Sequence, residues 1–184
     1  MQPIDTIPYR GYKIKVFIDE DPLNPSTEWD NAGTYVLSCG ERELATINTE
    51  ENANIWAAMI KAGEEIDKFK ARIRRQGGAV VEWSGSPHVD GFAYSRHEEV
   101  QEEWNGDVEA AERYLKAHIE TLAAYCNGEI YGYVVERGSY YDSCWGYYGD
   151  DGLKSMVEEA KGNIDHRRQE LRESRRFHGL SFSI

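Results

Sequence analysis

Two long stretches of the chain place apolar residues at the three-to-four spacing of an amphipathic helix. The first begins with a capping-box pattern, Asn48 and Glu51, and ends at Gly77. The second follows Asp107 and ends at Gly128. The apolar positions are Ile55, Met59, Ala62, Ile66, Phe69 and Ile73 in the first and Val108, Ala111, Leu115, Ile119 and Leu122 in the second.

Two further helices are predicted around these. Ser95 with Glu98 repeats the capping box and predicts a short helix to Trp104, which Gly106 ends. Apolar residues from Leu153 to Leu171 predict a last helix, which Gly162 weakens.

Runs of β-branched and aromatic residues between turn formers predict the strands. Residues 12–19 and 34–39 are expected to pair as a hairpin across a long polar loop. Residues 79–83 pair with 91–94, and residues 129–137 pair with 141–148. The expected fold is therefore α+β, with a mainly antiparallel sheet built from hairpins and three to four packed helices.

Length and composition predict the number of domains and the cellular compartment. The chain has 184 residues, of which 40% are hydrophobic, so we expect one domain over residues 1–184 with a loose tail over residues 176–184. The sequence contains no run of about 20 apolar residues, the length needed to span a membrane, and its first ten residues lack the pattern of a signal peptide. Cys39, Cys126 and Cys144 fit neither an even disulfide framework nor a zinc knuckle, which indicates a reducing cytoplasm.

Charge narrows the choice of partners. Asp and Glu outnumber Lys and Arg by 33 to 21, giving a net charge of −12. Such a field repels nucleic acid and anionic membranes, so direct nucleic-acid binding and membrane binding are disfavoured.

Carboxylates concentrate on the two predicted neighbouring helices in the middle of the chain. They are Glu98, Glu99, Glu102, Glu103, Asp107, Glu109 and Glu112. Such a run is usually a solvated helical face. The alternative is mimicry of nucleic-acid phosphates, in which carboxylates compete for a cationic groove on a protein.

Aromatic residues mark the predicted C-terminal hairpin. Those proposed for partner binding are Tyr131, Tyr133, Trp145 and Tyr147. Carboxylates flank them, which favours a core or a protein-binding surface over a platform for RNA. Strand alternation places Asp142, Cys144 and Gly146 on one face of the hairpin and Ser143, Trp145 and Tyr147 on the other.

Three other groupings were weighed as sites. The loop carboxylates and amides of residues 19–30 suit calcium chemically but lack EF-hand spacing. Cys144 as a nucleophile needs His88, His97, His118 or His166 as a base, and a structural cysteine is favoured. Basic residues cluster at 68–75 and at 167–176. No catalytic, cofactor-binding or metal-binding residue is assigned, and no cofactor is expected.

Two segments carry a resemblance. The first comprises residues 19–22 together with residues 28–34, which contain the sequence EWDN-x-GT. The second comprises residues 131–136, with the sequence YGYVVE, and residues 142–149, with the sequence DSCWGYYG. They resemble an uncharacterised family from bacteriophages, prophages and plasmids. The resemblance implies origin in a mobile element and residence in the cytoplasm of a bacterial host, and it implies no residue role.

These observations lead to one function hypothesis and two alternatives. The first is a non-catalytic accessory protein that binds and inhibits a host protein or nucleoprotein complex, such as a defence system, plausibly through acidic DNA mimicry. The alternatives are a small metal- or cysteine-dependent hydrolase and a nucleic-acid-binding regulator. A homodimer through the hairpin or a long helix is also open.

Overall fold

A computed structural model describes residues 2–29, 32–39, 66–86 and 89–179. Within these ranges the chain is α+β with antiparallel sheets, as expected. The chain length predicts one domain, whereas contacts divide the chain into two compact units. Unit 1 combines Met1–Pro22 with Glu129–Ile184, and unit 2 spans Leu23–Gly128.

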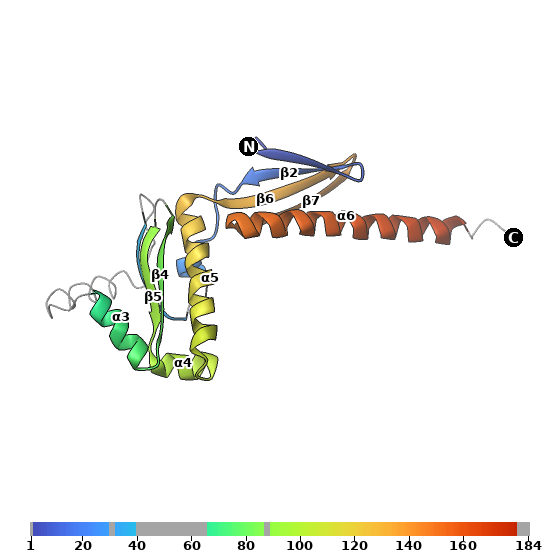
Figure 1. Ribbon diagram of the computed structural model, residues 1–184. Helices are drawn as coiled ribbons and strands as arrows, with labels where there is room; N and C mark the ends of the chain where they lie inside the picture. The colour runs from blue at the N-terminus through green and yellow to red at the C-terminus, as the bar shows by residue number, and fades with distance from the viewer. Residues whose placement is uncertain (1, 30–31, 40–65, 87–88, 180–184) are drawn as a thin grey trace. The chain divides into compact units, whose positions relative to one another are not determined.

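Unit 1 is a four-stranded antiparallel sheet with a long helix along one face (Figure 1). The strand order is β1-β2-β6-β7. Both ends of the chain contribute to it. Its elements are β1 (Asp5–Tyr9), β2 (Tyr12–Ile18), β6 (Ile130–Arg137), β7 (Tyr140–Tyr148) and α6 (Gly149–Gly179).

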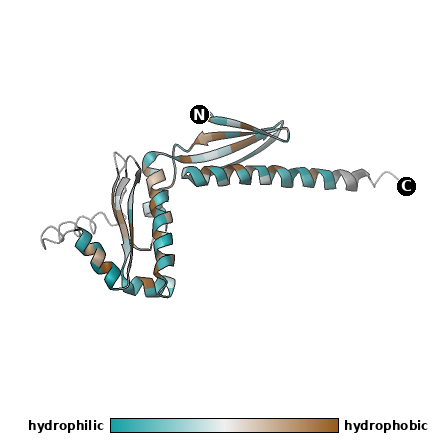
Figure 2. Cartoon of the chain, viewed as in Figure 1, coloured by the Kyte–Doolittle hydropathy of each residue, from teal (hydrophilic) through white to brown (hydrophobic). Residues whose placement is uncertain are grey.

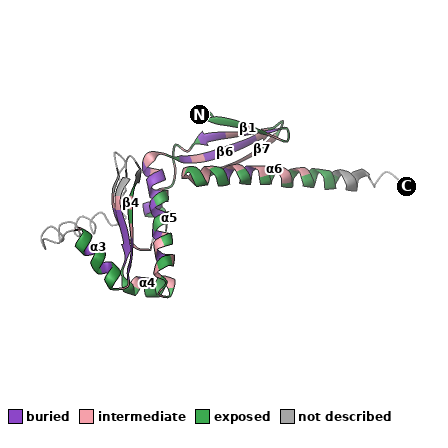
Figure 3. Cartoon of the chain, in the orientation of Figure 1, coloured by how far each residue is buried: buried purple, intermediate pink, exposed green. Residues whose placement is uncertain are grey.

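The core of unit 1 lies between the sheet and the first half of α6. Alternate residues of β2, such as Ile14 and Val16, meet a stripe on α6 formed by Met156, Ala160 and Ile164. All three stripe residues are fully buried, and their four-residue spacing keeps them on one side of the helix. Figure 3 shows the buried strands beside a helix that is largely exposed on its outer side.

The second half of α6 extends beyond this core. Residues 169–174 are exposed, and Figure 2 shows that most of the helix is hydrophilic. The helix continues to Gly179, so residues 176–179 of the expected tail are helical. Residues 180–184 lie outside the described part of the chain.

Unit 2 has three layers, with helices on both faces of a three-stranded antiparallel sheet (Figure 1). The strand order is β3-β5-β4. Its elements are α1 (Pro25–Glu28), β3 (Thr34–Cys39), α3 (Ile66–Arg75), β4 (Ala79–Ser86), β5 (Val89–Ser95), α4 (His97–Trp104) and α5 (Val108–Asn127).

Strand alternation divides the core of unit 2 between its two helical layers. Tyr35 and Ala93 face α5, where Leu115, Ile119 and Leu122 are fully buried. Their strand neighbours point the opposite way, toward α3. That second cluster contains Val36, Phe69, Ile73, Val80, Phe92 and Tyr94.

Most predicted elements are confirmed within a few residues, and the pairing of two hairpins is correct. The hairpin expected between residues 12–19 and 34–39 is wrong, because β2 pairs with β1 and β6 while β3 pairs with β5. The structure describes only the last part of the first predicted long helix. This part is α3, which ends before Gly77 as predicted, whereas residues 40–65 lie outside the described residues. The capping box at Ser95 is also wrong. Arg96 occupies the N-cap position of α4 and makes no side-chain cap bond.

The cysteines differ from the expectation of free thiols. Cys126, near the end of α5, is disulfide-bonded, and its partner lies outside the described side chains. Cys144 on β7 is free. An odd number of cysteines is thus compatible with a disulfide, so the cysteine count no longer supports a reducing compartment.

Candidate partner-binding site

The carboxylates predicted to bind a partner gather where α4 meets α5 in unit 2. Asn105 adopts the left-handed conformation that ends α4, and the Gly106 amide donates to the Val100 carbonyl at 3.0 Å. Asp107 then caps α5 by accepting from the Ala110 amide at 2.9 Å. These caps fix a tight junction between two helices whose first turns are acidic.

Five of the seven predicted carboxylates are exposed along α4 and at the start of α5. We call this set the acidic corner; it consists of Glu98, Glu102, Glu103, Asp107 and Glu109. Within the part of the chain that the structure describes, no ion pair involves any of them. The corner therefore presents uncompensated negative charge to the solvent.

The other two predicted carboxylates are partly withdrawn from the surface. Glu99 accepts a 2.5 Å hydrogen bond from the Gly33 amide, which ties α4 to the start of β3. Glu112 on α5 is half-buried. Glu99 is therefore a structural residue, and the exposed face is narrower than the sequence run.

The carboxylate spacing on α4 carries an energetic cost. Glu98 and Glu102 are four residues apart, as are Glu99 and Glu103, so like charges lie on the same helix faces. Each such pair destabilises a helix by roughly 0.2–0.5 kcal/mol. α4 has only eight residues, of which Val100 alone is fully buried. The acidic corner is thus maintained on a helix with little stability of its own.

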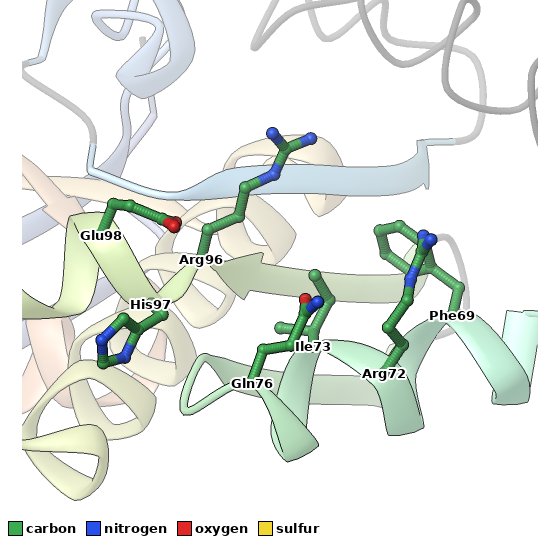
Figure 4. Close-up of a pocket in the computed structure, with 7 residues that line it drawn as sticks. All are labelled: Phe69, Arg72, Ile73, Gln76, Arg96, His97 and Glu98. Carbon is green, nitrogen blue, oxygen red and sulfur yellow. The ribbon is translucent and has the colours of Figure 1, made fainter.

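A cleft of about 460 Å³ lies beside the acidic corner, between α3 and the start of α4. Arg72, Gln76, Arg96, His97 and Glu98 contribute to its lining. Figure 4 shows that Arg72 and Arg96 extend from separate elements toward the same side of the view and that His97 is turned the opposite way. The polar groups do not converge, so the cleft defines no ligand.

The predicted aromatic hairpin divides between the two faces of the unit 1 sheet. Tyr133 is 1% exposed in the core beneath α6, and Tyr131 and Tyr147 pack against the same core. Trp145 lies on the opposite face and is 40% exposed. Of the four aromatic residues proposed for partner binding, Trp145 is the one available at the surface.

A bulge explains why Tyr147 was placed on the wrong face. Gly132 pairs with Trp145 and Tyr131 pairs with Tyr147, so Gly146 is an extra residue in β7. Gly146 has a φ of +85°, a conformation that favours glycine. The extra residue reverses the alternation, and Tyr147 joins Cys144 on the helix side. The Gly-containing sequence allowed a bulge, but strand periodicity alone does not show it.

The helix side of the hairpin holds a polar cluster around Cys144. Asn163 of α6 donates to the Tyr133 hydroxyl at 3.0 Å and to Asp142 at 3.3 Å. Burial, and secondarily the nearby Asp142, raises the pKa of Tyr133 to about 12. Burial also raises the pKa of Tyr147, which hydrogen-bonds Cys144 and Glu159. Both phenols stay protonated at neutral pH, which suits a structural cluster.

Cys144 interacts with the phenols of Tyr133 and Tyr147 and packs against the unit 1 core, as a structural cysteine does. His166, in the same unit, lies 3.4 Å from Glu170 on the exposed side of α6. His97 and His118 belong to unit 2, and His88 lies outside the described residues.

His118 forms an aromatic cluster that the sequence did not reveal. Its side chain is 7% exposed, and the rings of Trp29, Tyr35 and Tyr114 have centroids 6.2, 4.9 and 6.1 Å away. Its Nε2 atom has no hydrogen-bond partner. Burial lowers the pKa of His118 to about 4. Trp29, which follows α1, thus contacts His118 of α5 through its indole ring.

The loop carboxylates and amides that suit calcium are divided between the two units. Asp19 and Asp21 belong to unit 1, whereas Asn24 and Glu28 belong to unit 2. Asn24 instead caps α1 by accepting from the Ser26 amide at 2.9 Å. Asp30 lies outside the described residues, and no described group of three His, Cys, Asp or Glu side chains could hold a metal.

Two of the basic side chains at the end of α3 are paired with carboxylates. Lys70 lies 2.9 Å from Glu82 and 3.0 Å from Asp67, and its side chain is buried. Arg74 also contacts Glu82, at 3.5 Å. Arg72 and Arg75 are exposed at the same helix end.

Comparisons with known proteins add no further constraint. No family model matches the chain, and neither a curated protein nor a solved structure gives a significant match. None of the described helices has the length and apolar content required to cross a membrane. The candidate site therefore rests on the geometry of the chain itself.

Proposed function

We propose that this protein is a non-catalytic accessory factor of a bacterial mobile element that binds and inhibits a host protein or nucleoprotein complex. The observation that carries the proposal is the acidic corner, whose carboxylates are exposed and unpaired within the described structure. A row of fixed carboxylates attracts a cationic groove over a long range, as nucleic-acid phosphates do. The expected target is thus a nucleic-acid-binding protein, such as a component of a defence system.

The charge distribution between the units supports this assignment. Unit 2 contains 19 of the 33 acidic residues but only 10 of the 21 basic ones. Most of the net charge of −12 therefore belongs to the unit that carries the corner. The mobile-element origin rests on the resemblance of the two terminal segments.

The test compares capture of host proteins by three forms of the full chain. The corner variant carries Glu98→Gln, Glu102→Gln, Glu103→Gln and Glu109→Gln. Asp107 is left intact because it caps α5. The control variant carries Glu20→Gln, Glu28→Gln, Glu129→Gln and Asp150→Asn, which remove the same charge at exposed positions elsewhere.

We expect a nucleic-acid-binding host protein to be retained by the wild type and the control and lost from the corner variant. DNA added in excess should displace that protein, because it competes for the same groove. Equal retention by all three forms would show that the corner is not the binding surface. Retention of no host protein by the wild type would count against the proposed function as a whole.

A further inference from the structure

The face of the unit 1 sheet opposite α6 carries a distinct set of side chains, which we call the open face. Strand alternation and register place nine residues on it. They are Lys13, Lys15 and Phe17 on β2, Gly132, Val134 and Glu136 on β6, and Tyr141, Ser143 and Trp145 on β7. Tyr141, Trp145 and Lys13 are exposed to solvent.

The indole of Trp145 lies flat on this face because Gly132 has no side chain. A Cβ atom on Gly132 would come within 2.1 Å of the Trp145 ring. The ring of Phe17 is 5.9 Å from that of Trp145, which supports the indole from the β2 side. The outer side of Trp145 stays exposed, as does 65% of Tyr141.

The two exposed rings are spaced along one strand. Tyr141 and Trp145 are four residues apart on β7, or about 13 Å along the strand. This separation spans a few nucleotides of an extended single strand. Aromatic rings at such spacing on a sheet are suited to base stacking, which every base permits.

The charges of the open face differ from those predicted around the hairpin. Asp142 points to the helix side, where it bonds Asn163, and Asp150 and Asp151 lie in the first turn of α6. The one carboxylate on the open face, Glu136, is paired with Lys15 at 2.5 Å. Lys13 has no ion pair among the described residues. The argument that carboxylates surround the aromatics therefore does not apply to this face.

A recess of about 470 Å³ continues the open face at its Tyr141 end. Lys13, Glu136, Arg137 and Tyr141 contribute to its lining. The Arg137 guanidinium lies 4.8 Å from the centroid of the Tyr12 ring, which belongs to the core on the helix side. Lys13 is therefore the cation that the open face itself places near Tyr141, where a phosphate beside a stacked base would meet it.

We propose that the open face binds single-stranded nucleic acid, with bases stacked on Trp145 and Tyr141 and a phosphate near Lys13. An exposed lysine beside exposed rings distinguishes such a platform from a protein-binding patch, in which lysine is depleted. This inference is independent of the acidic corner.

The test is fluorescence anisotropy of a labelled oligothymidylate of about 20 nucleotides with the full chain at about 50 mM salt. We expect binding that weakens with added salt, because phosphates that contact lysine release bound counterions. Trp145→Ala, Tyr141→Ala and the double change Lys13→Gln with Lys15→Gln should each weaken binding about tenfold. Trp145→Phe, which keeps a ring, should retain most of it.

Two controls separate stacking on this face from general electrostatics. The double change Lys116→Gln with Lys154→Gln removes equal charge at exposed lysines elsewhere and should have no effect. The corner variant should bind the oligonucleotide at least as well as the wild type. A failure of this inference can therefore be distinguished from a failure of the proposed function.

Several results would overturn the inference. They are no binding by the wild type at low salt, equal weakening by the control lysine changes, and equal affinity for a duplex. Loss of a captured host protein from the Trp145 and Tyr141 variants, without any DNA binding by the wild type, would assign the face to a protein partner instead.

Discussion

At the scale of single residues, Gly132 determines where Trp145 can lie. The absence of a Cβ atom lets the indole rest on β6, and no other residue type provides that space. From the sequence alone, Gly132 would be interpreted as a glycine that weakens a strand, without any role in packing. Its role became clear from the cross-strand register, which depends on the bulge at Gly146.

Gly132→Ala should destabilise the protein by about 1–3 kcal/mol, because the new methyl group must displace the Trp145 ring. Urea unfolding measures the change. Gly162→Ala is the matched control, since Gly162 lies on the exposed side of α6 with open space around it. That change should stabilise the helix by roughly 0.5–1 kcal/mol. Equal effects of the two changes would contradict the contact with Trp145.

The buried His118 should make stability depend on pH. Its pKa falls from 6.5 to about 4 on folding, so the folded form stays neutral where the unfolded form binds a proton. The stability present above pH 6.5 is therefore lost as the pH falls toward 4, by roughly 3 kcal/mol in total. Urea unfolding at several pH values tests this, and His118→Leu should flatten the dependence over that range. An unchanged slope in the variant would assign the effect to other groups.

At the scale of elements, the caps of α5 and the two local hairpins were predictable, whereas the cap of α4 and the long-range strand pairings were not. Asp107 caps the start of α5 and Gly128 caps its end, as their sequence positions indicate, because caps depend on local hydrogen bonds. The partner of β3 is β5, some fifty residues away, and β2 reaches β6 from the other end of the chain. Such pairings depend on long-range packing, which local periodicity does not encode. The helix-side position of Tyr147 was missed for a similar reason.

Within the acidic corner, Asp107 has a structural role as the cap of α5 that Glu109 lacks. Asp107→Ala should cost about 1 kcal/mol in the free energy of unfolding, because the Ala110 amide loses its acceptor. Glu109→Ala, two residues later and without such a bond, should change stability by less than about 0.5 kcal/mol. Thermal unfolding of the two variants provides the comparison. Equal destabilisation would indicate that Asp107 does not act as a cap.

The helix α6 should divide into a stabilising half and a dispensable half. Met156→Ala removes a fully buried side chain from the unit 1 core and should cost about 2–5 kcal/mol. Removal of residues 175–184 should cost less than about 0.5 kcal/mol, because residues 169–174 before them are already exposed. A large loss of stability on truncation, measured by urea unfolding, would show that the end of α6 packs against another part of the protein.

At the scale of the whole molecule, net charge alone describes the chain poorly. Carboxylates concentrate at the α4–α5 junction of unit 2, while lysines and exposed rings share the open face of unit 1. The composition predicts repulsion of nucleic acid, and the structure resolves that average into an acidic surface and a locally cationic one. A nucleoprotein complex offers partners for both, a cationic protein groove and a single strand.

The central claim is that the acidic corner is the partner-binding surface. The most direct test measures the dissociation constant of the captured host protein for the wild type, the corner variant and the control variant over a range of salt concentrations. Binding by the wild type and the control should weaken steeply with salt, whereas the corner variant should bind at least tenfold more weakly with a flatter dependence. The same affinity and the same salt dependence in all three forms would contradict the claim.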